Sequence, residues 1–154
     1  MEIVFKDSQI AQISSHLNIT KTSVHNILTE YISYLRNKIS NGESIKFLNV
    51  CYLRVDGQVE NTFETLAYIA NEIGQRVGQQ QPIVYRVLTT YEEFLIKDLR
   101  KLNSYSIRGL IRIKLEKDYK GNWVVRTKKS TVYNGHDIYV TTMPSFKRKA
   151  EVVA

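Results

Sequence analysis

The hydrophobic positions of the chain repeat after 60 residues without a gap. An internal repeat of this length indicates two copies of one supersecondary unit. We therefore expect two similar units in tandem, at residues 1–60 and 61–154. A unit of about 60 residues buries too little surface to be comfortably stable alone, so the two are expected to share one core. Matching positions include Ile13 and Ile73, Val24 and Val84, Leu35 and Leu95, and Leu53 and Ile113.

Each copy predicts a short helix followed by a long one. The short helices are expected at residues 8–16 and 65–75, and the breaks after them carry capping residues. Apolar residues in the long helices follow the 3-and-4 spacing of a helix with one wide buried face. They are Val24, Ile27, Leu28, Tyr31, Ile32, Leu35 and Ile39 in the first copy, and Val84, Val87, Leu88, Tyr91, Phe94, Leu95 and Leu99 in the second.

Two short strands are expected after the long helix of each copy. They lie at residues 44–49 and 51–55 in the first copy, and at 104–108 and 110–116 in the second. In the last strand, apolar Ile111, Ile113 and Leu115 alternate with basic residues, which is typical of a half-buried strand. The predicted fold class is α+β.

The copies diverge after these strands. Only a few residues separate the first copy from the next helix, whereas the second copy continues into a basic, β-rich extension at residues 117–140. This extension carries two turn signals, at residues 120–122 and at Asn134-Gly135, and Asn-Gly is a strong hairpin signal. Residues 143–150 are expected to form a short terminal helix.

Residues 19–55 resemble the first half of the HU and integration-host-factor family of small architectural DNA-binding proteins, including its hairpin. The second copy resembles the same half again, with Gly109 at the family's first hairpin glycine. Residues 143–147, MPSFK, are similar to the family's V-P-A-F-K segment. The resemblance implies two tandem HU-like helix–helix–β-hairpin units, the first without its arm and the second with an extended β-arm. It also implies a pseudo-dimer, formed within one chain or between chains.

The arm departs from the family pattern. Family arms carry an R-N-P-x-T-G run whose proline wedges between base pairs. Here the run is STVYNG, at residues 130–135, so Val132 takes the wedge position at the arm tip, followed by Tyr133. An added turn at residues 119–123 lengthens the arm and is expected to refold it. Sharp bending of DNA needs wrapping contacts on both flanks, so we do not expect it.

Positive charge is concentrated in the second half of the chain. Lys and Arg number 22 against 15 Asp and Glu, a net charge of +7, and residues 1–62 contribute none of it. A basic half indicates a surface facing a polyanion, most often nucleic acid. A solvated sheet face and a seat for an acidic protein remain open alternatives. The candidate DNA-binding residues are Arg112, Lys114, Lys117, Arg126, Lys128, Lys129, Lys147, Arg148 and Lys149.

Two further features allow more than one interpretation. Tyr119 and Trp123 are candidates for base stacking or for packing across a hairpin. Residues 10–28 allow a helix-turn-helix interpretation. Against it, the predicted second helix continues to Ile39 and carries core residues, and this half has no net positive charge.

No pattern indicates catalysis or a metal site. Cys51 is the single cysteine, and His16, His25 and His136 lie on unrelated segments without the spacing of metal ligands or of a catalytic triad. We expect no enzyme activity, no cofactor and no small-molecule substrate. The apolar runs are too short to span a bilayer, and the first ten residues lack a secretion signal, so we expect neither a membrane partner nor secretion.

These observations predict a non-enzymatic structural protein used for protein–protein assembly, with other protein subunits as partners in a homo- or hetero-oligomer. The chain, with ten tyrosines, resembles the HU-like virion ring proteins of crAss-like tailed phages. That resemblance implies a portal or tail ring or collar component, located in the virion or in the cytoplasm of the host or a bacterium. The alternative is an architectural protein that contacts double-stranded DNA through the basic second half.

Overall fold

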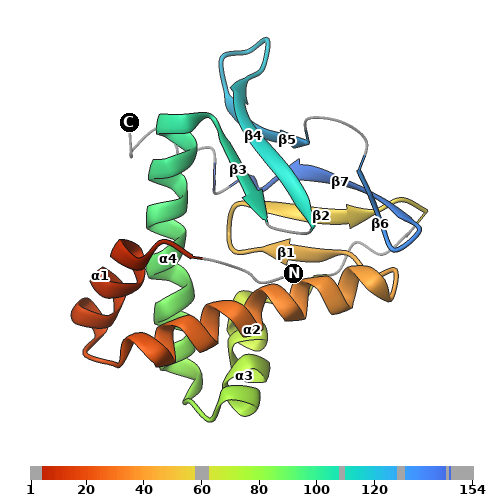
Figure 1. The fold of residues 1–154 in the computed structure, drawn as a ribbon. Helices are drawn as coiled ribbons and strands as arrows, with labels where there is room; N and C mark the ends of the chain where they lie inside the picture. Colours follow the sequence, from red (N-terminus) through yellow and green to blue (C-terminus); the bar gives the residue numbers. More distant parts are fainter. Residues whose placement is uncertain (1–4, 58–62, 108–109, 128–130, 145, 147–154) are drawn as a thin grey trace.

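The computed structural model describes residues 5–57, 63–107, 110–127, 131–144 and 146. Within them it contains four helices and two antiparallel sheets, which confirms the α+β class (Figure 1). The helices are α1 (Asp7–Leu17), α2 (Lys21–Ser40), α3 (Leu66–Val77) and α4 (Gln81–Leu102). The strands are β1 (Ile45–Phe47), β2 (Cys51–Val55), β3 (Ser104–Ile107), β4 (Ile111–Lys117), β5 (Trp123–Thr127), β6 (Thr131–Tyr133) and β7 (His136–Thr142).

Capping residues separate the short helices from the long ones. Asn18 ends α1 in the left-handed conformation, with φ 56°, and Thr20 accepts a side-chain hydrogen bond from the Ser23 N–H at the start of α2. Gly78, with φ 73°, ends α3. Pro82 lies in the first turn of α4, where its missing N–H would have no helical partner anyway. Local residue chemistry therefore accounts for both helix–helix breaks.

The helices of the two units interlock. Each short helix packs against both long helices, since α1 contacts α2 and α4, and α3 contacts the same two (Figure 1). Buried side chains of both units form one hydrophobic cluster, in which Ile13 and Ile73 are each 0% exposed. Burying these apolar side chains against one another is the main stabilising contribution to the fold.

The strands form two sheets of unequal size. One has the order β1-β2-β7-β6 and the other the order β3-β4-β5. In the first, β7 lies antiparallel to β2, with Leu53 opposite Val140 and Val55 opposite Ile138. A side chain links the two sheets, because Thr142 Oγ1 accepts a 2.8 Å hydrogen bond from the Val125 N–H and donates to the Val125 carbonyl at 3.2 Å.

The C-terminal extension differs from the expected single arm. It forms two hairpins, β4–β5 and β6–β7, and the second pairs with β2 of the first unit instead of extending from the second. Asn134 and Gly135 close the β6–β7 hairpin with positive φ angles of 48° and 81°. The pairing gives hydrogen-bond partners to the backbone N–H and C=O groups along the edge of β2, which would otherwise remain exposed. It also buries Ile138.

Parts of the predicted architecture lie outside the described residues. These are Gly109, Ser130 and most of the predicted terminal helix. Phe146 is described, and its side chain is fully buried. The likeness to HU-type tandem units stays a prediction.

Candidate interaction surface

Three of the candidate DNA-binding residues lie on the outer face of the three-stranded sheet. Arg112, Lys114 and Arg126 project from the side opposite the buried residues of β4, and Lys114 lies directly across from Arg126. Glu116 projects between them. Its carboxylate lies 3.3 Å from Lys114 Nζ and 2.6 Å from Arg126 Nε. The positive charge of this face is therefore partly neutralised.

Lys117 lies on the opposite face of the same hairpin, beside Trp123. Its Nζ is 4.9 Å from the centroid of the Trp123 ring, and Cζ of Arg100, in the last turn of α4, is 4.3 Å from the same centroid. The half-buried indole therefore packs between sheet and helix, which favours the packing interpretation of Trp123. The described basic candidates thus lie on two faces and do not converge on one groove.

Tyr119 occupies the tip of the β4–β5 hairpin, which extends away from the helices (Figure 1). Its side chain is 92% exposed. The Asp118 carboxylate accepts hydrogen bonds of 2.9 Å from the backbone N–H groups of Lys120 and Asn122, so the turn has a defined shape. The other basic candidates, Lys128, Lys129, Lys147, Arg148 and Lys149, lie outside the described residues.

The predicted arm tip lies against the first unit. Val132 is opposite Asp137 in the β6–β7 pair and is 64% exposed, while Tyr133 is half-buried. Asn134 Nδ2 donates a 2.8 Å hydrogen bond to Ser40 Oγ at the end of α2. The tip is thus part of a sheet and is held against the end of α2.

Sequence reasoning missed an arginine on the outer face of the four-stranded sheet. Arg54 lies opposite Tyr139, and its Cζ is 5.2 Å from the Tyr52 ring centroid and 5.0 Å from the Phe63 ring centroid. Its Nε donates a 2.9 Å hydrogen bond to Thr141 Oγ1. We refer to this surface as the Arg54 face, made of Tyr52, Arg54, Phe63, Val132, Tyr139 and Thr141.

The only local signal for this face was the alternation of β2. Tyr52 and Arg54 occupy the positions between its buried residues, which places both on the side away from the core. Thr141, which orients Arg54, lies 87 residues further along the chain. No sequence spacing could have placed it beside Arg54.

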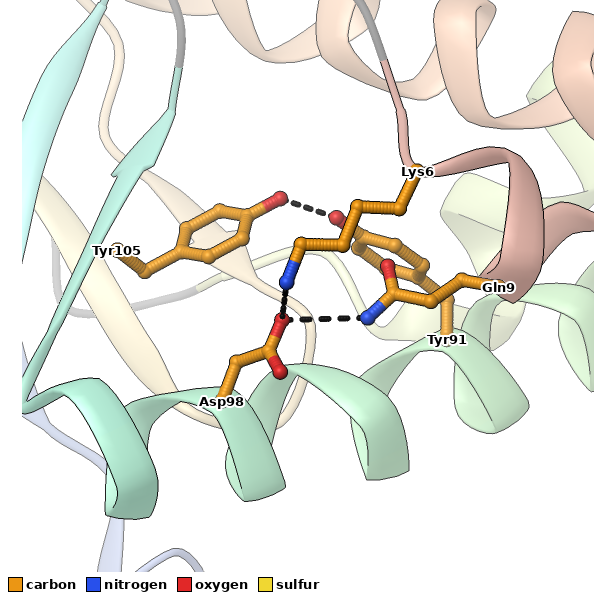
Figure 2. Close-up of polar contacts among 5 residues, drawn as sticks. All are labelled: Lys6, Gln9, Tyr91, Asp98 and Tyr105. Atoms are coloured by element: carbon orange, nitrogen blue, oxygen red, sulfur yellow. Dashed lines mark hydrogen bonds and ion pairs between the residues drawn. The ribbon is translucent and has the colours of Figure 1, made fainter.

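A polar cluster joins the N-terminal helix to the second unit (Figure 2). The Asp98 carboxylate accepts hydrogen bonds from Lys6 Nζ at 3.0 Å and from Gln9 Nε2 at 3.1 Å. Beside it, the hydroxyl groups of Tyr91 and Tyr105 are hydrogen-bonded to each other. Burial raises the pKa of both phenols, so both stay protonated at neutral pH. The cluster connects α1, α4 and β3 and presents no activated nucleophile.

The cysteine and the three histidines, all of which are described, do not form a cluster. Burial raises the pKa of the Cys51 thiol, whereas reactive cysteines need a lowered pKa and access to solvent. His16, His25 and His136 lie on three different elements. In the part of the chain that the structure describes, no group of three or more His, Cys, Asp or Glu side chains could bind a metal ion. No described helix has the length and apolar character needed to cross a membrane.

The helix-turn-helix interpretation of residues 10–28 conflicts with the packing of α2. This helix runs unbroken for 20 residues, and Ile27 and Leu28 are 0% and 1% exposed. A recognition helix must present a side to the DNA groove beyond its core-facing residues. Here α2 is instead a central helix of the shared core.

Comparisons with known proteins found no significant match. No family model matches the chain, and no curated protein or solved structure matches it either.

Proposed function

We propose that the protein is a non-enzymatic structural component that assembles with neighbouring protein subunits through the Arg54 face. The observation that carries this proposal is the exposure of Val132 and Tyr139, at 64% and 43%, on a sheet face built around Arg54. Exposed apolar and aromatic side chains gathered on one face are typical of protein–protein contacts.

The distribution of basic residues supports assembly over DNA bending. Phosphate binding is strongest where several cations reach one duplex together. Arg112 and Arg126 lie on one face of the three-stranded sheet and Lys117 on the other, and Glu116 pairs with Arg126. The resemblance to HU-like virion ring proteins agrees with this use of the fold, and we place the protein in a ring or collar of a phage virion.

Architectural DNA binding is the alternative function. It is favoured by the tip of the β4–β5 hairpin, where the Lys120 Nζ lies 5.6 Å from the ring of the exposed Tyr119. An exposed aromatic ring beside a cation can stack on a nucleic-acid base.

Two measurements on the full chain distinguish these functions. Light scattering after size-exclusion chromatography gives the mass in solution over a range of concentrations. Binding to a duplex of about 35 base pairs at several salt concentrations gives the number of phosphate contacts. We expect concentration-dependent oligomers, together with weak DNA binding whose dependence on salt is shallow.

Substitutions locate the interface. The double variant Val132→Asp with Tyr139→Asp should lower the mass, because each places an unpaired charge in an apolar contact. Tyr119→Asp, at a still more exposed position outside the Arg54 face (92% exposed), is the control. A chain that stays monomeric and binds DNA tightly, with a steep salt slope lost in the Lys128→Glu, Lys129→Glu variant, would overturn the proposal.

A further inference from the structure

The guanidinium of Arg54 is already oriented. Two aromatic rings, Tyr52 and Phe63, lie 5.2 and 5.0 Å from its Cζ, and the two ring centroids are 4.4 Å apart. The Nε–H points to Thr141 Oγ1 at 2.9 Å. This hydrogen bond engages Nε alone, and among the described residues the two Nη groups make none.

A guanidinium that is oriented in this way is suited to bind a carboxylate. Its planar donor groups match the two oxygens of a carboxylate, and the resulting paired hydrogen bonds are charge-assisted. Because contacts on the sheet restrict the side chain before binding, less conformational entropy is lost when a partner binds. Arginine and tyrosine are also the residues that most often dominate the binding energy of protein interfaces.

The residues around Arg54 indicate which chemical groups a partner must present. Tyr139 and Val132 are 43% and 64% exposed beside it, and burying them would remove water from around an ion pair and strengthen it. The charged residues of this side of the sheet are Lys46, Arg54 and Asp137, so positive charge is in excess. A symmetric contact between two copies through this face would set four cations against two carboxylates and leave positive charge unpaired, which disfavours it.

We propose that the Arg54 face binds a segment of a neighbouring protein subunit that presents a carboxylate between apolar side chains. This inference rests on the proposed function and gives the chemistry of the partner at that same face. The carboxylate pairs with the free edge of Arg54, and the apolar side chains cover Tyr139 and Val132. A phosphate is the less suitable ligand, because aromatic and apolar side chains, and not further arginines, surround Arg54.

The test uses the full chain and a defined probe. The probe is an eight-residue peptide of alternating Glu and Val, and its matched control has Gln at every Glu position. Binding is followed by fluorescence anisotropy and by the NMR signal of the Arg54 Nε–H. We expect the Glu peptide to bind and to shift that signal, and the Gln peptide to bind at least tenfold more weakly.

Variants distinguish specific binding at Arg54 from a general attraction between the peptide and the positively charged protein. Arg54→Gln should weaken binding of the Glu peptide at least tenfold, and Arg54→Lys several-fold, because lysine keeps the charge but loses the planar pair of donors. Arg112→Gln removes the same charge from the other sheet and should change binding less than twofold. Circular dichroism checks that each variant is folded. If Arg54→Gln does not fold, the comparison is made with Arg54→Lys, which is the smaller change.

Three results would overturn the inference. They are equal losses in Arg54→Gln and Arg112→Gln, equal binding of the Glu and Gln peptides, and a larger shift of the Arg54 signal by inorganic phosphate than by the Glu peptide. The mass measurement separates this failure from failure of the proposed function. If Val132→Asp with Tyr139→Asp abolishes assembly while Arg54→Gln leaves it unchanged, the result supports the proposed assembly function. The same result contradicts the proposal that Arg54 binds a carboxylate of the partner.

Discussion

The carboxylate of Glu92 accepts a 2.7 Å hydrogen bond from the backbone N–H of Asn49. Glu92 lies on α4 of the second unit and is 3% exposed, whereas Asn49 lies in the turn between β1 and β2 of the first. The repeat counterpart of Glu92 is Ile32, which is apolar and buried. The tandem repeat is therefore broken at a point where one unit supplies the polar partner for a turn of the other.

Replacing Glu92 by isoleucine, the residue at the matching position of the first copy, should destabilise the chain. The half-buried Asn49 N–H would lose this acceptor, and we expect a cost of about 1 kcal/mol, at the low end of the range for an unsatisfied donor. Glu92→Gln should cost less, because its amide oxygen can still accept. Urea unfolding measures both, with Glu93→Gln on the exposed neighbour as control. If Glu92→Ile unfolds at the wild-type urea concentration, this hydrogen bond does not contribute to stability.

Alkaline conditions should destabilise the fold. Burial raises the pKa of Tyr31, Tyr91 and Tyr105 above the ordinary phenol value of 10.0, and it raises that of Cys51 above 9.0. These groups stay protonated in the folded chain at a pH where the unfolded chain has released its protons. Their stabilising contribution is therefore complete below the unfolded pKa values and falls as pH rises through them.

The free energy of unfolding should thus be nearly level from pH 7 to about 8.5 and decline above about pH 10. Urea midpoints followed by circular dichroism test this. Tyr31→Phe should give a shallower decline, since it removes one buried phenol. A midpoint that does not change between pH 9 and 11 would contradict the assignment.

Phe146 should be essential to stability despite lying near the end of the chain. Its side chain is 0% exposed within the shared hydrophobic cluster. Phe146→Ala should cost about 3–5 kcal/mol, the range for removing a buried aromatic ring. Val132→Ala, on a side chain that is 64% exposed, is the control and should change stability by less than about 0.5 kcal/mol. Thermal unfolding compares them, and similar losses in both would show that the C-terminal segment packs differently.

Thr142 should contribute to the stability of the fold through its hydroxyl group alone. Thr142→Val keeps the shape of the side chain but removes both hydrogen bonds to Val125, and we expect a loss of about 1–2 kcal/mol. Hydrogen exchange of the Val125 amide should become faster, because that amide loses its acceptor. Thr127→Val, at the end of the same strand as Val125, is the control. Unchanged exchange at Val125 would mean that the two sheets are joined without this side chain.

Local patterns accounted for the elements themselves. The apolar spacing that includes Val24, Leu28 and Leu35 predicted a long helix, and α2 buries these residues. Asn134-Gly135 predicted a hairpin, and both residues adopt the positive φ angles that such a turn requires. The candidate surface was harder to predict, because a single exposed arginine in a short strand such as Arg54 gives no local signal of the residues that will surround it.

The sequence by itself determined the helices, the hairpins and the α+β class, because these depend on side-chain periodicity and on capping and turn residues that act over a few positions. Only the tertiary structure decided that β7 pairs with β2. Strand edges offer the same backbone donors and acceptors whatever their sequence, so the choice of partner depends on which pairing buries residues such as Ile138. That choice also brought Tyr139 and Thr141 beside Arg54, and so created a surface that no local pattern encodes.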